Sequence, residues 1–340
     1  MQERLLIIQT AFIGDAILTL PLIQELKKVN PERIIDVITI PKCMEIFKAS
    51  PYTDRVISFD KRGSEKSIPE LIKFAKKINL NKYDKLICLH RSLRSAILSF
   101  LIKAGIKAGF STSSFPYVFD SVVDYRFDYH EVRRNLVFCE KEFDNENWRI
   151  LPEVKTHNNY FEEKLIFESE FNKGIIAIAP GSVWQTKKYP LEEFLRLTEI
   201  LAAKGFSFII IGDSKEEDAG EEFSRKFPGQ ALNFCGKLSI PESIELLRMC
   251  RLLITNDSAP THFGVAAGIK VLTIYTSTVP NFGFYPYNWG SDFIGLDDLA
   301  CKPCGIHGYN ECPKGHFSCA KMLKAEMIAA KAEKMLDGYK

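Results

Sequence analysis

The chain has 340 residues, of which 46% are apolar and 26% are charged. This length suits two domains, because a single hydrophobic core rarely grows beyond roughly 300 residues. A formal net charge of +2 excludes whole-chain electrostatic attraction to nucleic acid. The apolar N-terminal stretch is interrupted by Thr10, Gly14 and Asp15, and no later run reaches the roughly 20 apolar residues that cross a bilayer. We therefore expect a cytoplasmic protein with reduced cysteines.

The first half of the sequence alternates short apolar runs with longer amphipathic stretches. The predicted strands cover 5–9, 34–40, 56–59 and 85–89, and the predicted helices cover 14–28, 42–49, 68–78 and 95–103. Continuous apolar strands separated by amphipathic helices indicate a parallel sheet that is covered on both faces.

A polar stretch over 145–173 interrupts this alternation and is the predicted linker. The predicted strands then cover 174–179, 206–211, 231–234, 252–255 and 271–275, and the predicted helices cover 190–203, 216–226, 241–249, 258–267 and 320–336. We expect an α/β fold with two doubly wound domains, 1–155 and 156–325, followed by a C-terminal helix over 326–340. Ligands bind outside the carboxyl ends of strands in such sheets, so a cleft between the domains is the expected site.

The turn after the first strand carries the first candidate for chemistry. It lacks the Gly-x-Gly-x-x-Gly pattern of dinucleotide-binding oxidoreductases. Gly14 allows a tight turn into the helix, and Asp15 follows at the helix N-terminus. Asp15 is interpreted either as a helix cap favoured by the helix dipole or as a general base facing the other domain, and the two roles are compatible.

Three segments of the second half suggest a site for a phosphorylated ligand. Ser182 follows the first strand of that half, and Lys187 precedes the next helix, so both suit phosphate contacts. Glu216 begins a helix after the second strand, where an acid either accepts ribose hydroxyls or favours the helix dipole. The segment 255–262, which contains Asp257, Ser258 and His262, lies between a strand and a helix, where free backbone N–H groups suit a diphosphate. Taken alone, His262 is better explained as a packed helix residue.

No two aspartates are spaced Asp-x-Asp, the carboxylate pair that many transferases use to hold a nucleotide-sugar diphosphate through a metal. The sequence therefore favours a leaving group neutralised by lysine and helix termini. We expect no metal and no cofactor at the active site.

Taken together, these motifs resemble glycosyltransferase family 9, in particular the ADP-heptose:lipopolysaccharide heptosyltransferases. The resemblance rests on 13–15, 180–190 and 256–262, in the same order and spacing, and a Cys-rich segment over 301–319 is similar to heptosyltransferase II-like members. It implies a GT-B fold, in which two Rossmann-like domains face each other across a cleft. It also implies an inverting transfer of heptose from ADP-heptose to the inner core of lipopolysaccharide.

The resemblance implies roles for individual residues. Asp15 matches the proposed catalytic base and Lys187 the lysine that meets the donor diphosphate. The remaining positions that match donor-binding residues are Gly14, Ser182, Glu216, Leu238, Asp257, Ser258 and His262. Ala259 stands where Gly is usual and Thr261 where Met is common, so another nucleotide sugar remains an alternative.

The implied acceptor is an anionic core oligosaccharide, anchored by lipid at the cytoplasmic face of the inner membrane, where the enzyme would be peripheral. Arg91 and Arg94, which follow a predicted strand, suit carboxylates or phosphates, as does the pair 61–62. Ordinary surface cations explain these residues equally well.

Four cysteines lie close together near the C-terminus, with a histidine among them: Cys301, Cys304, Cys312, His316 and Cys319. Four thiolates, or three with the histidine, would hold a tetrahedral zinc. The second pair lacks the usual two-residue spacing. The alternative is that the cysteines stay reduced and pack together without a metal. A non-enzymatic binding module built on this cluster is a further alternative, which the near-neutral charge disfavours.

Overall fold

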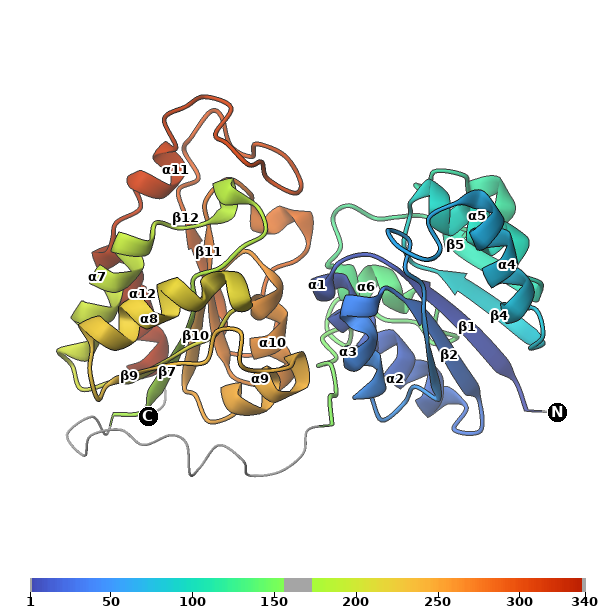
Figure 1. Ribbon diagram of the computed structural model, residues 1–340, viewed down its shortest axis with the longest axis horizontal. Helices are drawn as coiled ribbons and strands as arrows, with labels where there is room; N and C mark the ends of the chain where they lie inside the picture. The colour runs from blue at the N-terminus through green and yellow to red at the C-terminus, as the bar shows by residue number, and fades with distance from the viewer. Residues whose placement is uncertain (1, 156–172, 338–340) are drawn as a thin grey trace. The chain divides into compact units, whose positions relative to one another are not determined.

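The computed structural model describes residues 2–155 and 173–337. The chain divides into an N-terminal unit, Met1–Lys155, and a C-terminal unit, Thr156–Lys340. Figure 1 draws the N-terminal unit in blue to green and the C-terminal unit in green to red. Most of the predicted linker, 156–172, lies outside the described residues.

The described part of the N-terminal unit holds a six-stranded parallel sheet in the order β3-β2-β1-β4-β5-β6. Its strands are β1 (Arg4–Gln9), β2 (Ile34–Thr39), β3 (Arg55–Ser58), β4 (Tyr83–Cys88), β5 (Ala104–Phe110) and β6 (Ser121–Val123). Its helices are α1 (Ile13–Ile17), α2 (Leu20–Val29), α3 (Met44–Lys48), α4 (Ile68–Ile78), α5 (Leu93–Leu101) and α6 (Glu131–Leu136), with short 3₁₀ turns η1 (Pro41–Cys43) and η2 (Pro116–Val118).

The side chains of β1 point alternately to the two faces of the sheet, which explains why helices must cover both faces. Leu6 and Ile8 join the buried cluster formed with α4 and α5. Leu5 and Ile7 are also fully buried, and successive strand residues point to opposite faces, so they pack toward the other layer of helices. The continuous apolar run of β1 is therefore the pattern of a strand buried on both faces.

The described part of the C-terminal unit repeats this architecture with the strand order β12-β11-β10-β7-β8-β9, again all parallel. Its strands are β7 (Ile175–Ala179), β8 (Ser207–Ile210), β9 (Ala231–Asn233), β10 (Leu252–Asn256), β11 (Lys270–Tyr275) and β12 (Asp292–Gly295). Its helices are α7 (Leu191–Ala202), α8 (Glu217–Lys226), α9 (Ile240–Leu247), α10 (Ala259–Ala267), α11 (Ser318–Lys321) and α12 (Ala325–Asp337), with 3₁₀ turns η3 (Gln185–Lys187), η4 (Ser214–Glu216) and η5 (Pro280–Phe282).

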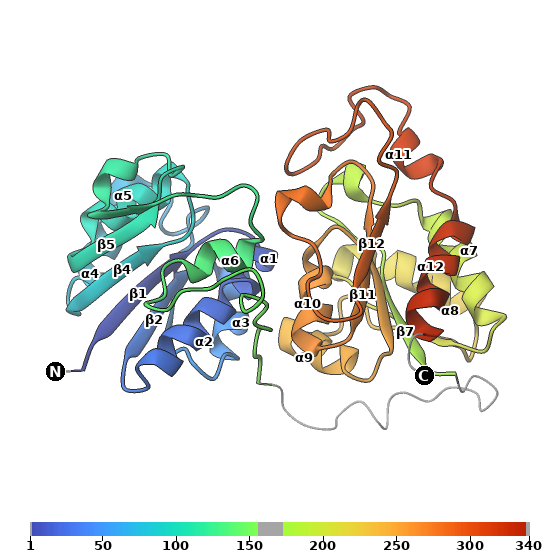
Figure 2. The ribbon, with the colours of Figure 1, turned by 180° about the vertical axis from the view of Figure 1, so that it is seen from behind.

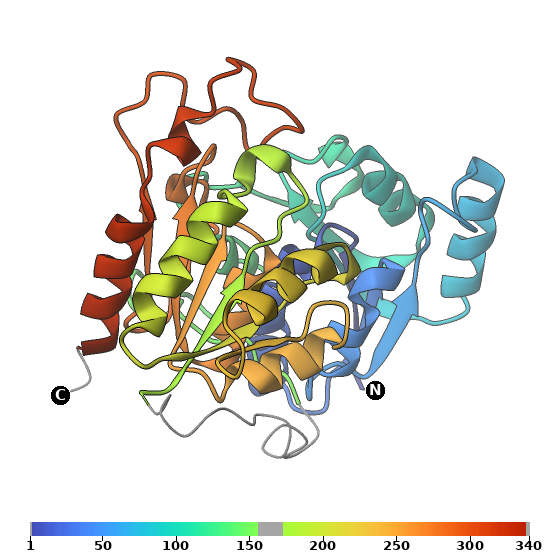
Figure 3. The ribbon, with the colours of Figure 1, turned by 60° about the vertical axis from the view of Figure 1, so that its left-hand side comes forward.

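The C-terminal helix α12 is part of the C-terminal unit. It packs beside α7 (Figure 3), and Ile328 and Ala332 lie in the same buried cluster as Phe194 and Leu197 of α7. On the opposite face of the sheet, α10 packs on β10 and β11.

Counted within its own unit, each sheet has the strand order 3-2-1-4-5-6 of a doubly wound fold. The order reverses between β1 and β4 in the first sheet and between β7 and β10 in the second. Ligands bind at this switch point, beyond the carboxyl ends of the strands. The loops after β1 and β4, and those after β7 and β10, are therefore the expected functional loops.

Two helices predicted as single segments are each divided in two. The segment 14–28 forms α1 and α2, because Pro21 lies in the first turn of α2 and has no N–H for a continuous helix. The segment 320–336 is divided near Leu323, whose carbonyl accepts a hydrogen bond from the Tyr189 hydroxyl at 2.7 Å. The Glu193 carboxylate then accepts from Ala325 N at 3.0 Å, which starts α12.

The prediction also missed β5, β6, β12 and α6, which are short or contain glycine. Among the residues that the structure describes, no helix is both long and apolar enough to cross a membrane.

Candidate functional site

Asp15 lies in the first turn of α1, directly beyond the carboxyl end of β1. Its carboxylate accepts a hydrogen bond from Phe12 N at 3.2 Å, so the capping interpretation holds in this structure. The side chain is half-buried. Burial raises the pKa of Asp15 to about 7, the nearby Glu131 adds to this, and Arg91 opposes it. A carboxyl group with a pKa near neutrality is suited to accept a proton from a substrate.

His90 and Lys61 fix the loop that precedes α1 through Thr10. The Thr10 hydroxyl hydrogen-bonds His90 Nδ1 at 2.8 Å, and Lys61 Nζ donates to the Thr10 carbonyl at 2.6 Å. Burial lowers the pKa of His90 to about 4, so its imidazole is neutral. The loops after β1, β3 and β4 therefore meet at Thr10, the residue that directly follows β1.

Arg91 and Arg94 occupy different environments although both follow β4. The Arg91 guanidinium lies over the Tyr125 ring, 3.9 Å from its centroid. Arg94 donates to the carbonyl oxygens of Glu65 and Lys66 at 2.9 and 2.8 Å. Arg94 thus holds the loop before α4, whereas Arg91 stacks beside the carboxyl end of the sheet.

The C-terminal unit brings Lys187 and Asp257 together. Lys187 Nζ lies 2.6 Å from Asp257 Oδ2, and the Thr278 hydroxyl donates to the same oxygen at 2.6 Å. These residues come from η3 and from the loops after β10 and β11. Asp257 therefore fixes the position of the Lys187 ammonium group at the switch point of the sheet.

Asn256, which sequence reasoning missed as a separate functional residue, joins the loops after β7 and β10. Its Nδ2 donates to the Pro180 carbonyl at 2.7 Å, and its Oδ1 accepts from Tyr189 N at 3.0 Å. The Ser258 hydroxyl donates to the Gly181 carbonyl at 3.2 Å. Ser258 is also the N-cap residue of α10, so the predicted phosphate loop and the N-terminus of α10 are held side by side.

Glu216 packs beneath two glycines of the same region. A Cβ added at Gly181 would lie 2.6 Å from Glu216 Cδ, and one at Gly212 would lie 2.8 Å from Glu216 Cβ. At Gly212 the contact is with a Cβ atom that the backbone fixes, so only glycine allows this close approach there. Glu216 also accepts from Asp213 N at 3.2 Å and lies 3.6 Å from Lys188 Nζ. Burial, followed by the neighbouring Asp213, raises the pKa of Glu216.

His262 lies in the first turns of α10 and is 5% exposed. Within the described residues its Nδ1 has no hydrogen-bond partner. Burial lowers the pKa of His262 to about 4, so the imidazole is neutral and offers a hydrogen bond rather than a charge.

The site residues thus form one group in each unit. Asp15 and Arg91 lie near one another in the N-terminal unit, and the donor-site candidates Ser182, Lys187, Glu216, Asp257, Ser258 and His262 gather around the carboxyl ends of β7, β8 and β10. The model of the family described as glycosyltransferase family 9 (heptosyltransferase) matches residues 71–311.

This chain belongs to glycosyltransferase family 9. Lipooligosaccharide heptosyltransferase 2 of Haemophilus influenzae is 24% identical to it over 295 residues, which cover 82% of this chain and 84% of that relative. The solved structure of a family 9 glycosyltransferase from Veillonella parvula has a TM-score of 0.84 and 21% identity, covering 99% of this chain and 98% of that one. E. coli ADP-heptose lps heptosyltransferase II has a TM-score of 0.79 and 18% identity, with 98% and 99% covered.

These similarities confirm the predicted family and the GT-B type of α/β fold. Membership of family 9 makes the chain a glycosyltransferase, which sets aside the alternative of a non-enzymatic binding module.

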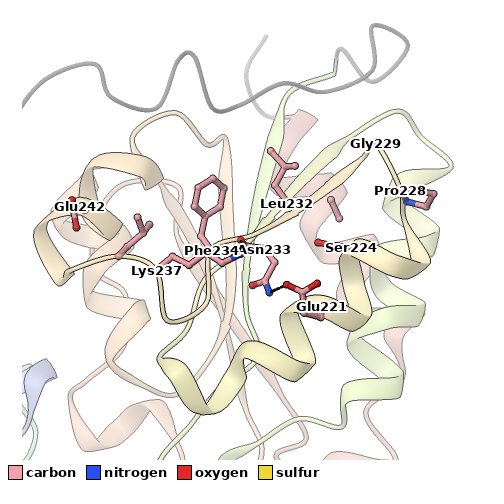
Figure 4. Close-up of a pocket in the computed structure, with 11 residues that line it drawn as sticks. Glu221, Ser224, Pro228, Gly229, Leu232, Asn233, Phe234, Lys237 and Glu242 are labelled. Atoms are coloured by element: carbon pink, nitrogen blue, oxygen red, sulfur yellow. Dashed lines mark hydrogen bonds between the residues drawn. The ribbon is translucent and has the colours of Figure 1, made fainter.

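Leu238 is a predicted donor-site residue in the loop between β9 and α9 of this family 9 enzyme. It lines a pocket of about 700 Å³ along the edge strand β9. Glu221 and Ser224 of α8 and Asn233 of β9 line it as well (Figure 4). The loop that carries Leu238 is joined to the segment before Glu216, because Gly236 N donates to the Gly212 carbonyl at 3.0 Å.

The Cys-rich segment of the family 9 chain packs on the η3 turn that carries Lys187. Tyr309 N donates to the Thr186 hydroxyl at 2.8 Å, and Cys304 N donates to the Ser277 carbonyl at 2.9 Å. Cys301 Sγ lies 3.9 Å from His316 Nε2. Over 2–155 and 173–337, no group of three or more His, Cys, Asp or Glu side chains is arranged to hold a metal. The segment thus contacts both η3 and the loop after β11.

Proposed function

We propose that this family 9 glycosyltransferase moves a heptose from ADP-heptose to the inner core of lipopolysaccharide, in the manner of heptosyltransferase II. The observation that carries the proposal is the similarity to lipooligosaccharide heptosyltransferase 2 along 82% of the chain. The arrangement of Asp15 in one unit and of Lys187 with Asp257 in the other supports it.

The reaction is a single displacement with inversion at the anomeric carbon. Asp15 accepts the proton of the acceptor hydroxyl while its oxygen forms the new bond to the anomeric carbon. The bond between that carbon and the diphosphate oxygen breaks, and both electrons leave with the nucleoside diphosphate. Lys187 and the free N–H groups at the start of α10 stabilise the negative charge that develops there.

Asp257 acts by orienting Lys187 rather than by meeting the diphosphate. Its carboxylate oxygen is occupied by the Lys187 ammonium group and the Thr278 hydroxyl, and a second anion would repel the leaving group. Glu216 contacts the donor ribose in this proposal, and the neutral His262 donates a hydrogen bond to the sugar or phosphate.

The acceptor is a lipid-anchored, anionic core oligosaccharide, which brings the enzyme to the cytoplasmic face of the inner membrane. Arg91 offers a guanidinium group to its carboxylates or phosphates. Arg94, whose guanidinium donates to Glu65 O and Lys66 O, contributes by keeping the loop 60–67 in place.

Replacing both Arg91 and Arg94 by Gln is expected to raise the acceptor KM by about tenfold, the effect of losing one charge-assisted hydrogen bond. Arg91→Gln alone should reproduce the change in KM, whereas Arg94→Gln should mainly lower the melting temperature. Steady-state kinetics at saturating donor measure the first effect and thermal unfolding the second. Arg4→Gln, at the amino end of β1, is the matched control. An acceptor KM that the double variant leaves unchanged would identify both residues as ordinary surface cations.

The donor is tested by thermal unfolding with a panel of nucleotide sugars. A ligand present at 100 times its Kd stabilises the folded state by about 2.7 kcal/mol when it does not bind the unfolded chain. ADP-heptose is expected to raise the melting temperature by several degrees and UDP-sugars to leave it unchanged. Stabilisation by a UDP-sugar alone would show that the donor is a different nucleotide sugar from ADP-heptose. Ala259 and Thr261, which depart from the family pattern, leave this alternative open.

A further inference from the structure

A buried cluster around α6 has no place in the mechanism described above. Glu131 Oε2 accepts hydrogen bonds from the Tyr125 hydroxyl at 2.8 Å and from Arg134 Nη1 at 3.0 Å. Arg134 is held in turn, because its Nε donates to the Arg126 carbonyl and its Nη2 to the Phe127 carbonyl, both at 2.7 Å. Glu131, Arg134 and Tyr125 are 6%, 2% and 7% exposed. The Glu131 carboxylate is therefore fixed in a site with little access to water.

This cluster is attached to the helix that carries Asp15. The Asn135 amide of α6 donates to the carbonyl of Leu18, the C-cap residue of α1, at 3.1 Å. Figures 1 and 2 both draw α6 beside α1. Asn135 is fully buried, so this hydrogen bond fixes the position of α6 relative to the helix that carries Asp15.

Four ionisable groups from four other segments surround Asp15. Glu131 of α6 disfavours the charged form of Asp15, and Arg91 after β4 favours it. Cys43 of η1 interacts with Asp15 as well, but burial raises the pKa of its thiol to about 12, so it is neutral. Lys61, whose pKa burial lowers, also lies within electrostatic reach. Glu131 is thus the carboxylic acid among these four groups, and it is paired with Arg134 at 3.0 Å.

We propose that Glu131 is a positioning residue of the transfer reaction, whose fixed negative charge makes Asp15 a stronger proton acceptor. The inference rests on the proposed role of Asp15 as general base. Arg91 belongs to the same cluster, since its guanidinium covers the Tyr125 ring, and it opposes the effect of Glu131 on Asp15. The balance between these two charges sets the basicity of Asp15 beyond what burial alone provides. A general base works best when its pKa is near the operating pH.

The test is the pH dependence of kcat/KM in Glu131→Gln. Glutamine keeps an oxygen that accepts from Tyr125 and Arg134 but removes the charge. The acid-side midpoint, expected near 7 in the unaltered enzyme, should fall by roughly 0.5–1 pH unit, as one neighbouring charge of like sign predicts. Activity should therefore persist to lower pH, while the plateau at high pH falls because the base is weaker. Glu131→Asp, which keeps the charge, should retain the original midpoint.

Two controls separate charge from folding. Tyr125→Phe removes a hydrogen bond from Glu131 and keeps its charge, so it should lower the melting temperature without moving the midpoint. Glu25→Gln removes another buried glutamate of the same unit, which is paired with Lys28 at 2.9 Å, and should not move the midpoint either. An unchanged midpoint in Glu131→Gln, or the same displacement in Tyr125→Phe, would overturn the proposal.

A readout without substrate distinguishes this inference from the proposed function. Titration of ¹³C-labelled aspartate carboxyl groups by NMR, with Asp15→Asn to identify the Asp15 signal, reports the pKa of Asp15 directly. A lower pKa in Glu131→Gln supports the coupling, and an unaltered one contradicts it. If that pKa falls while Asp15→Asn retains full turnover, the role of Asp15 as base fails and the electrostatic coupling stands.

Discussion

Asp15→Asn is expected to lower turnover by about 10²–10⁴-fold, the usual contribution of a general base. The amide has nearly the same shape and still accepts from Phe12 N, so α1 keeps its first turn, but it takes no proton from the acceptor hydroxyl. Because the donor-site candidates lie in the other unit, affinity for the nucleotide sugar should change little. Turnover is measured by release of the nucleoside diphosphate, and donor affinity by calorimetry.

Asp36→Asn provides the matched control for this experiment. Asp36 is a buried aspartate of β2 in the same unit, and its carboxylate accepts from the Tyr83 hydroxyl at 2.7 Å. Its replacement should reduce stability and preserve turnover per folded molecule. Undiminished turnover in Asp15→Asn would remove Asp15 from the mechanism, and an equal loss in both variants would indicate a structural effect.

Lys187→Gln is expected to reduce kcat by about 10²–10³-fold, the effect of removing one preorganised group that stabilises developing negative charge. The loss should be larger in kcat than in donor affinity, because the charge on the diphosphate increases as the bond to the sugar breaks. Single-turnover kinetics with saturating donor separate the two quantities.

Lys226→Gln is the corresponding control in the same unit. Lys226 ends α8 and lies 3.5 Å from Glu199, a largely exposed ion pair, so its loss should alter neither kcat nor donor affinity. Equal kcat values for Lys187→Gln and the unaltered enzyme would exclude Lys187 as the group that neutralises the leaving diphosphate.

The sequence predicted the alternation of strands and helices well where apolar runs were continuous. The runs at β1, β7 and β10 have no polar interruption, as expected of strands buried on both faces. By contrast, β5 contains two glycines and β6 has three residues, so neither shows the pattern of a strand. The pairing of β5 with β4 and of β6 with β5 depends on tertiary contacts that local sequence does not encode.

In the candidate site, too, local sequence patterns predicted some residues, whereas the surroundings of others depend on tertiary contacts. Asp15, Lys187 and Asp257 could be proposed as candidates because each lies between the end of an apolar strand and the next helix, or in the first turn of that helix. Glu131 was not among the candidates because the strand before α6, β6, has only three residues and was itself not predicted. The sequence His130-Glu131 at a helix start, with Arg134 one turn later, nevertheless carried a usable signal. The different environments of Arg91 and Arg94 were unpredictable, because the carbonyl groups of Glu65 and Lys66 are distant in sequence.

The half-buried carboxyl of Asp15 has a consequence for the robustness of the protein. Its pKa is about 7 in the folded chain against 3.8 for an exposed aspartate, so the folded state holds a proton that the unfolded chain releases. The stabilising contribution of this group is complete in acid and declines as the pH rises from about 4 to about 7. At neutral pH and above, the unliganded enzyme should therefore have a lower melting temperature than its Asp15→Asn variant. The enzyme gives up thermal stability for a more reactive carboxylate.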